Sequence, residues 1–227
     1  VLYVKCKDEY ALITKFLKFW KHLDPDVVTG WYIEGFDIPY LVRRITKLFN
    51  YDKAKELSPW GILFENKNNA FGKEKFEYNL VGIATLDYVK QYQYFVAPYL
   101  EVKPEDYKLN TVAYADLGEK KLDFSEYGSL QNLYKHDFQK FMEYNIRDTN
   151  LVNRLDDMHG ILGQTMATAY DAKVNFEDVY MQVRMWDVIV HNELLARGIV
   201  TPPKKYQRKD DQYAGAAVKE PIVGMHD

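Results

Sequence analysis

The sequence predicts an α/β fold, because strand-like and helix-like patterns alternate through its first half. Residues 8–23 carry apolar side chains at helical spacing, and residues 27–31 form a short run rich in β-branched side chains. Asp37 and Pro39 then suit the first turn of a helix expected over 37–49, with Asp37 as its N-cap. This alternation favours a sheet covered by helices.

The other elements follow from local patterns. Residues 57–80 are irregular with a polar tip at 66–69, which favours a long hairpin. A strand is expected over 82–88, ending near Asp87. The second half is mostly helical, with helices expected over 107–116, 129–135, 137–157, 160–171 and 176–197. A strand end over 1–5 and a last strand over 212–218 complete the prediction.

Composition excludes several classes of protein. The chain has 227 residues, of which 47% are hydrophobic and 28% charged, so global disorder and a fibrous repeat are excluded. Thirty Lys and Arg against 33 Asp and Glu give a net charge of −3. This balance excludes a histone-like binder driven by charge alone, but it is compatible with a local basic groove. The length suits one large domain, or one domain and part of another.

Cysteine usage and hydropathy indicate the compartment. Cys6 is the single cysteine, so no internal disulfide can form, and a reducing compartment is the simpler interpretation. No apolar run approaches the ~18 residues that a membrane span needs. We therefore expect a cytoplasmic protein with no membrane or disulfide partner. The chain opens on a strand pattern without an initiator Met, which favours a fragment of a longer protein.

The helix expected over 137–157 contains the first candidate site. Asp148 lies inside its apolar stripe, and Tyr144 lies one turn earlier on the same side. A buried carboxylate needs a cation, a metal or several donors as partner. A structural ion pair with Arg147 or Arg154, or a bond from a backbone amide, explains Asp148 equally well. The stripe consists of Phe138, Phe141, Met142, Val152 and Leu155.

Two further acids follow predicted strands. Asp37, with Glu34 nearby, comes after the strand at 27–31, and Asp87 ends the strand at 82–88. Ligand sites in α/β sheets gather at the carboxyl ends of strands. A simple N-cap explains Asp37 without any ligand, and turn chemistry explains Asp87.

The C-terminal part combines positive charge with small residues. Tyr213-Ala214-Gly215-Ala216 would let a nucleic-acid backbone approach closely, although a bulged strand start explains it too. The preceding linker has no acid among its positive charges, which can meet phosphates or simply be solvated. These charges are Arg197, Lys204, Lys205, Arg208 and Lys209.

In combination, two acids at element ends, a Tyr one turn from one of them and a basic strip indicate a phosphodiester metal site. Two divalent ions about 3.5–4 Å apart can activate a water and stabilise the leaving oxygen. Such a pair needs bridging carboxylates, and two carboxylates are too few to hold both ions.

Three motifs give the chain a resemblance to family B DNA polymerases. Residues 31–40 (WYIEGFDIPY) resemble the second exonuclease motif, and residues 144–148 (YNIRD) resemble the third, Tyr-x-x-x-Asp. Residues 213–216 (YAGA) resemble the Tyr-x-Gly-Gly/Ala motif between the exonuclease and polymerase modules. The segments 117–123 and 169–175 are similar to replicative polymerases of tailed phages. The resemblance covers nearly the whole chain.

The resemblance implies a 3′→5′ proofreading exonuclease with a ribonuclease H-like core, a mixed sheet and many helices, truncated at its first strands. It implies that Asp37 and Asp148 each bind one of two metal ions, usually Mg²⁺ and otherwise Mn²⁺. Tyr144 would bond the attacking water or the scissile phosphate. The loop at 63–80 would be the hairpin that helps to move a primer end between sites. The residues expected to contact DNA are Phe36, Tyr213, Gly215, Lys204, Lys205 and Arg208.

Two features depart from the family pattern. The first exonuclease motif, Asp-x-Glu, has no counterpart here and is expected upstream, as the palm motifs are expected beyond residue 227. Tyr32 stands where the second motif often has Asn, which would alter a substrate contact.

The preferred interpretation is therefore an exonuclease domain over 1–196, incomplete at its N-terminus, followed by a basic linker and first strand over 197–227 that lead to a polymerase palm. DNA is the expected partner, and a sliding clamp is an expectation for the parent enzyme only. The rival is a catalytically incomplete module that binds nucleic acid or scaffolds a complex. A free-standing exonuclease is disfavoured by the linker and the Tyr213 motif.

Overall fold

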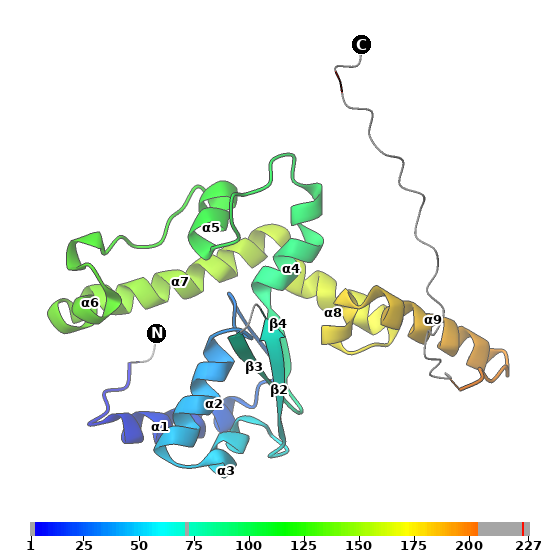
Figure 1. Ribbon diagram of the computed structural model, residues 1–227, viewed down its shortest axis with the longest axis horizontal. Coiled ribbons are helices and arrows are strands. Elements are labelled where there is room, and N and C mark those ends of the chain that lie inside the picture. The colour runs from blue at the N-terminus through cyan, green and yellow to red at the C-terminus, as the bar shows by residue number, and fades with distance from the viewer. Residues whose placement is uncertain (1–2, 71–72, 204–223, 225–227) are drawn as a thin grey trace. The chain divides into compact units, whose positions relative to one another are not determined.

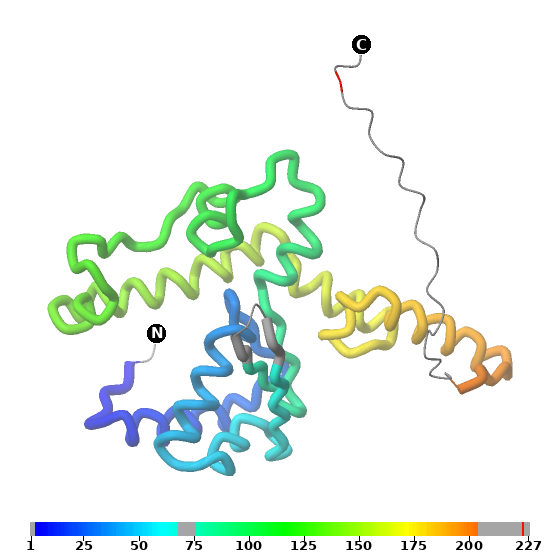
Figure 2. The backbone as a smooth tube through the Cα atoms, in the orientation of Figure 1, coloured from blue at the N-terminus to red at the C-terminus, as the bar shows by residue number. Residues whose placement is uncertain are grey.

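The computed structural model describes residues 3–70, 73–203 and 224. The chain divides into two compact units, 1–189 and 190–227, which are described separately. Figures 1 and 2 show the course of the chain. In chain order the elements are α1 (Glu9–Leu23), β1 (Val27–Gly30), α2 (Asp37–Leu48), α3 (Tyr51–Ala54), η1 (Lys55–Leu57), β2 (Leu63–Ala70), β3 (Lys73–Leu80), β4 (Ala84–Asp87), α4 (Tyr88–Phe95), η2 (Ala97–Tyr99), α5 (Leu109–Leu117), η3 (Ser125–Tyr127), α6 (Leu130–His136), α7 (Phe138–His159), α8 (Ile161–Ala172), η4 (Phe176–Tyr180) and α9 (Gln182–Ala196).

The strands of the described residues form two separate pairs. β1 and β4 are parallel and in register from Val27 opposite Ala84 to Gly30 opposite Asp87. β2 and β3 form an antiparallel hairpin, which confirms the hairpin predicted over 57–80. The α/β class is thus confirmed, whereas one mixed sheet is not seen in this part of the chain.

The first hydrophobic core lies between α1, α2 and the hairpin. Asp8 caps α1 by accepting a hydrogen bond from the Ala11 amide at 2.7 Å, and Asp24 ends it in a left-handed conformation. Apolar side chains at helical spacing then face inward from both helices. The buried members of this core include Ile13, Leu17, Ile38, Val42, Ile45, Leu57 and Leu80.

The second core lies around the C-terminal half of α7. Leu151, Val152 and Leu155 are buried there against residues of α4, α5 and α8. The N-terminal half differs from the predicted stripe, because Phe138 is 41% exposed. Its ring contacts Tyr134 and Phe141 in an aromatic cluster at the surface.

Four sequence expectations need correction. Residues 3–5 form no strand, and the segment Tyr88–Phe95 is a helix that was not predicted. The helix expected over 176–197 is interrupted at Met181, whose ψ of 76° is not helical, so η4 precedes α9. The N-cap of α2 is Phe36, which makes no side-chain capping hydrogen bond, and Asp37 is the first helical residue.

The second unit contains the end of α9, where His191 Nδ1 lies 3.0 Å from Thr201 Oγ1 of the segment that follows the helix. Five of the expected DNA contacts (Lys204, Lys205, Arg208, Tyr213 and Gly215) lie outside the described residues, as does the strand expected over 212–218. Within the described ranges, no helix has the length and apolar character required to cross a membrane.

Candidate functional site

Asp87 fixes the loop that leads from β1 to Asp37. Because β1 and β4 are parallel, Gly30 and Asp87 end at the same edge. The Asp87 side chain is 1% exposed, and it accepts hydrogen bonds from the backbone amides of Tyr32 (3.1 Å), Glu34 (3.2 Å) and Val89 (3.2 Å). Burial, and then the charge of Glu34, raise the pKa of Asp87. The loop is therefore pinned to β4 by one buried carboxyl group.

Tyr32 occupies an unusual backbone conformation within this loop. Its φ is +64°, in the left-handed region where Asn and Gly are favoured over other residues. Asn would therefore suit the backbone conformation at this position better than Tyr does. The Tyr32 ring lies over Gly35, where an added Cβ would overlap it.

Asp37 begins α2 at the end of this loop. The residue is exposed, yet protein atoms on one side of its carboxyl group withhold water and raise its pKa. Phe36 and Tyr40, beside it, are 63% and 55% exposed. Their ring centroids are 6.1 Å apart with 14° between the planes, so they form an aromatic platform at the start of α2.

Asp148 projects from α7 against the segment that joins α5 to η3. Lys121 Nζ lies 2.6 Å from Asp148 Oδ2, and the Asp148 side chain is 26% exposed. Asp148 Oδ1 is buried and has no hydrogen-bond partner in the described part of the chain. Asp148 is therefore in an ion pair, but its cation is Lys121 and not Arg147 or Arg154, so the pairing expected from the sequence is wrong. Arg147 and Arg154 instead pair with Glu119.

Tyr144 lies one turn before Asp148, as the spacing predicts. Its ring meets Phe124 edge-on at 5.3 Å, and Lys121 Nζ lies 5.6 Å from the ring centroid. A cavity of about 420 Å³ runs past Tyr144 along residues 120–125. Tyr144, Lys121 and Asp148 therefore belong to one local cluster.

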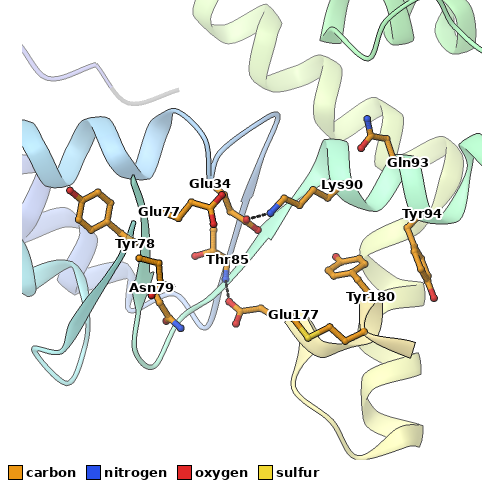
Figure 3. Close-up of a pocket in the computed structure, with 12 residues that line it drawn as sticks. Glu34, Glu77, Tyr78, Asn79, Thr85, Lys90, Gln93, Tyr94, Glu177 and Tyr180 are labelled. Atoms are coloured by element: carbon orange, nitrogen blue, oxygen red, sulfur yellow. Dashed lines mark hydrogen bonds and ion pairs between the residues drawn. The ribbon is translucent and has the colours of Figure 1, made fainter. Parts of the chain in front are cut away.

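A second cavity, of about 580 Å³, adjoins the hairpin and β4 (Figure 3). Glu177 of η4 accepts a hydrogen bond from the Thr85 amide at 2.9 Å, and Lys90 pairs with Glu34. Burial, and the charges of Glu34 and Asp178, raise the pKa of Glu177. This wall carries several carboxylates, so it repels phosphates rather than binding them.

Two contributors to the site had weak sequence signals. Lys121 lies 27 residues from Asp148 and belongs to a segment without periodicity. Asp87 was noted only as a strand end, and its bonds to a loop more than 50 residues away had no local signal. Among the hydrogen bonds and ion pairs of the described residues, none joins Asp37 to Asp148.

One protein-family model matches just under half of the chain. Residues 2–112 match the exonuclease domain of DNA polymerase family B. This stretch therefore belongs to the exonuclease domains of family B DNA polymerases, and pairwise alignments extend the relationship over the whole chain.

The relatives include two phage enzymes and a eukaryotic one. The DNA-directed DNA polymerase of Escherichia phage RB69 is 30% identical over 227 residues, which cover 100% of this chain and 24% of the relative. That of Enterobacteria phage T4 is 28% identical over 222 residues, covering 97% and 24%. The DNA polymerase delta catalytic subunit of Schizosaccharomyces pombe is 28% identical, covering 97% and 21%. The chain spans about a quarter of the length of these relatives.

Proposed function

We propose that the chain is the proofreading 3′→5′ exonuclease portion of a DNA-directed DNA polymerase, with a ribonuclease H-like core. The observation that carries this proposal is the Asp148 cluster. A buried carboxylate oxygen without a hydrogen-bond partner lies there, one helical turn from Tyr144, in a chain of this family. Such an oxygen is costly to bury unless a ligand completes it.

The donor set fits a hard divalent cation such as Mg²⁺ or Mn²⁺. Carboxylate oxygens are the ligands that these ions prefer. Asp148 offers Oδ1, and Asp37 offers an exposed carboxyl group with a raised pKa. No cluster of three or more His, Cys, Asp or Glu side chains suited to a metal occurs in the described ranges. A two-ion site therefore requires further carboxylates, which we expect on a strand beside β1.

Each residue has a distinct role in this proposal. Asp148 and Asp37 would hold the ions, and the bound ions would supply Lewis-acid chemistry toward the scissile phosphate and a water. The Tyr144 hydroxyl orients that water or the phosphate. Lys121 places a positive charge beside Asp148, where the substrate's negative charge arrives. The platform of Phe36 and Tyr40 provides faces on which unpaired bases at the 3′ end can stack.

The boundaries in this proposal are residues 1–196 for the exonuclease domain and 197–227 for the basic linker toward a palm. Primer–template DNA is then the partner of the full-length protein, with Lys204, Lys205, Arg208, Tyr213 and Gly215 contacting it. The hairpin of β2 and β3 would help to move the primer end between sites. A sliding clamp remains a partner proposed for the parent enzyme.

The decisive experiment compares excision with primer extension in the full-length protein. Excision of 3′-labelled single-stranded DNA should require Mg²⁺ or Mn²⁺ and stop in EDTA. Asp148→Ala should abolish excision and leave primer extension intact, because the two activities use separate metal sites. Asp157→Ala, at an exposed position of the same helix, is the matched control and should retain both activities.

Equal loss of excision and extension in Asp148→Ala would overturn the assignment. DNA binding by a wild-type protein without any metal-dependent cleavage would favour the rival, a catalytically incomplete binding module. The ligand count supports that rival for the chain taken alone, because Asp37 and Asp148 are two carboxylates for two ions.

A further inference from the structure

The segment of residues 119–123, here called the strap, lies against α7 beside Asp148. Gly118, with a φ of +68°, ends α5 and turns the chain into the strap. Asn110 Oδ1 accepts a hydrogen bond from the Lys121 amide at 2.9 Å, which ties the strap to α5. Lys121 Nζ then reaches Asp148.

Glu119 is the strap's main attachment to α7. Its carboxylate pairs with Arg154 Nη1, and with Arg147 Nη2 at 2.6 Å. Arg147 and Arg154 are seven residues apart, so they lie on one face of the helix, two turns from each other. Arg147 Nε also donates to the Lys120 carbonyl oxygen at 3.4 Å. The side chain of Glu119 is only 19% exposed, and it forms ion pairs with two guanidinium groups, although Oε2 makes no hydrogen bond to any described residue.

The geometry of the strap explains how Glu119 affects its neighbour. Glu119 and Lys121 are two residues apart and both contact α7, while Arg147 and Asp148 are adjacent on the helix. A lysine ammonium on a long flexible stem is held weakly by one partly exposed ion pair, because ordering the stem costs entropy. Anchoring the backbone at Glu119, two residues from Lys121, removes much of that entropic cost.

We propose that Glu119 is a positioning residue, which anchors the strap to Arg147 and Arg154 and thereby holds Lys121 against Asp148. Its consequence for excision rests on the function proposed above. In this proposal Glu119 affects excision only by positioning Lys121, and it does not contact the substrate.

The anchoring is tested by lysine labelling of the full-length protein, in EDTA, with an amine-acylating reagent and peptide mass spectrometry. Glu119→Gln removes the charge and should raise the acylation rate of Lys121 several-fold, while Lys140 stays unchanged. The matched control is Glu126→Gln, because Glu126 forms an ion pair with Lys140, which lies on α7. That variant should raise labelling of Lys140 and leave Lys121 unchanged.

The link to excision is tested by a double-mutant cycle. Glu119→Gln should slow excision several-fold in the wild-type background and have no further effect in Lys121→Met, because its effect passes through Lys121. An equal loss in both backgrounds would mean a merely structural role and overturn the proposal. So would unchanged labelling of Lys121 in Glu119→Gln. If the wild-type protein shows no excision while the labelling responds as expected, the proposed function fails and the anchoring stands.

Discussion

Single residues in this chain show how one side chain controls a conformation elsewhere. Tyr32 has a left-handed backbone that costs a residue with a Cβ about 1 kcal/mol or more. The hydrogen bond from the Tyr32 amide to Asp87, at the end of β4, holds the residue in this conformation despite the cost. The backbone conformation at position 32 therefore depends on a contact made by a residue 55 positions away.

Replacing Tyr32 with Asn should raise the free energy of unfolding by about 0.5–1 kcal/mol, because Asn tolerates a positive φ. The Tyr32 side chain is half exposed, so little burial is lost. Urea denaturation of the chain, followed by tryptophan fluorescence, measures the change. A loss of stability would show that the ring's packing over Gly35 outweighs the strain.

The same contact predicts coupling between Tyr32 and Gly35. Gly35→Ala should destabilise the wild-type chain, because the new Cβ overlaps the Tyr32 ring and forces it to move. In the Tyr32→Asn background the cost should fall, since the ring is absent. Purely additive effects in the four-variant cycle would contradict the packing described here.

At the scale of elements, the loop between β1 and α2 is positioned by β4 rather than by its own sequence. Trp31 donates a hydrogen bond to the Tyr107 carbonyl oxygen and packs on Tyr88 of the second core, while Ile33 is buried in the first core. Asp87 accepts hydrogen bonds from the amides of Tyr32 and Glu34, which lie between and just after these two residues. These contacts position the start of α2 and therefore Asp37.

Asp87→Asn should lower the free energy of unfolding by about 1–3 kcal/mol. Asn keeps one acceptor oxygen, but its NH₂ group would face the amide of either Glu34 or Tyr32, donor against donor. Hydrogen exchange at those amides should accelerate. Asp52→Asn, at a side chain that is 83% exposed, is the control and should leave exchange in the loop unchanged.

At the scale of the whole molecule, buried acids make stability depend on pH. Glu177, Asp87 and Asp37 all have raised pKa values, chiefly because burial disfavours the charged form. The folded state therefore holds protons more tightly than the unfolded state. The contribution of Glu177 to stability therefore falls as pH rises from the ordinary Glu value of 4.5 through its raised value in the folded state.

Glu177→Gln should reduce that fall as pH rises above 4.5. Gln retains an oxygen that can accept the Thr85 amide bond, and it carries no charge to bury beside Glu34 and Asp178. Urea denaturation at several pH values measures the slope, with Glu101→Gln as an exposed control. Identical slopes in wild-type and Glu177→Gln chains would show that Glu177 is not among the groups responsible.

The sequence by itself determined the helices with strong apolar periodicity, the hairpin, the two acidic motifs and the spacing of Tyr144 and Asp148. These depend on neighbours within one or two turns, which periodicity and motif spacing describe. It missed α4 and the break at Met181, where local patterns are weak. At Met181 the continuous helix expected over 176–197 gives way to η4, whose Asp178 and Val179 are buried.

Only the tertiary structure decided which charges meet. Arg147 and Arg154 are neighbours of Asp148 on α7, yet they pair with Glu119, and the cation on Asp148 comes from a residue 27 positions away. Asp87 likewise holds a loop 53 to 55 residues earlier. Such contacts depend on how irregular segments lie across helices and sheet ends, and this follows from the packing of the two cores rather than from any local pattern.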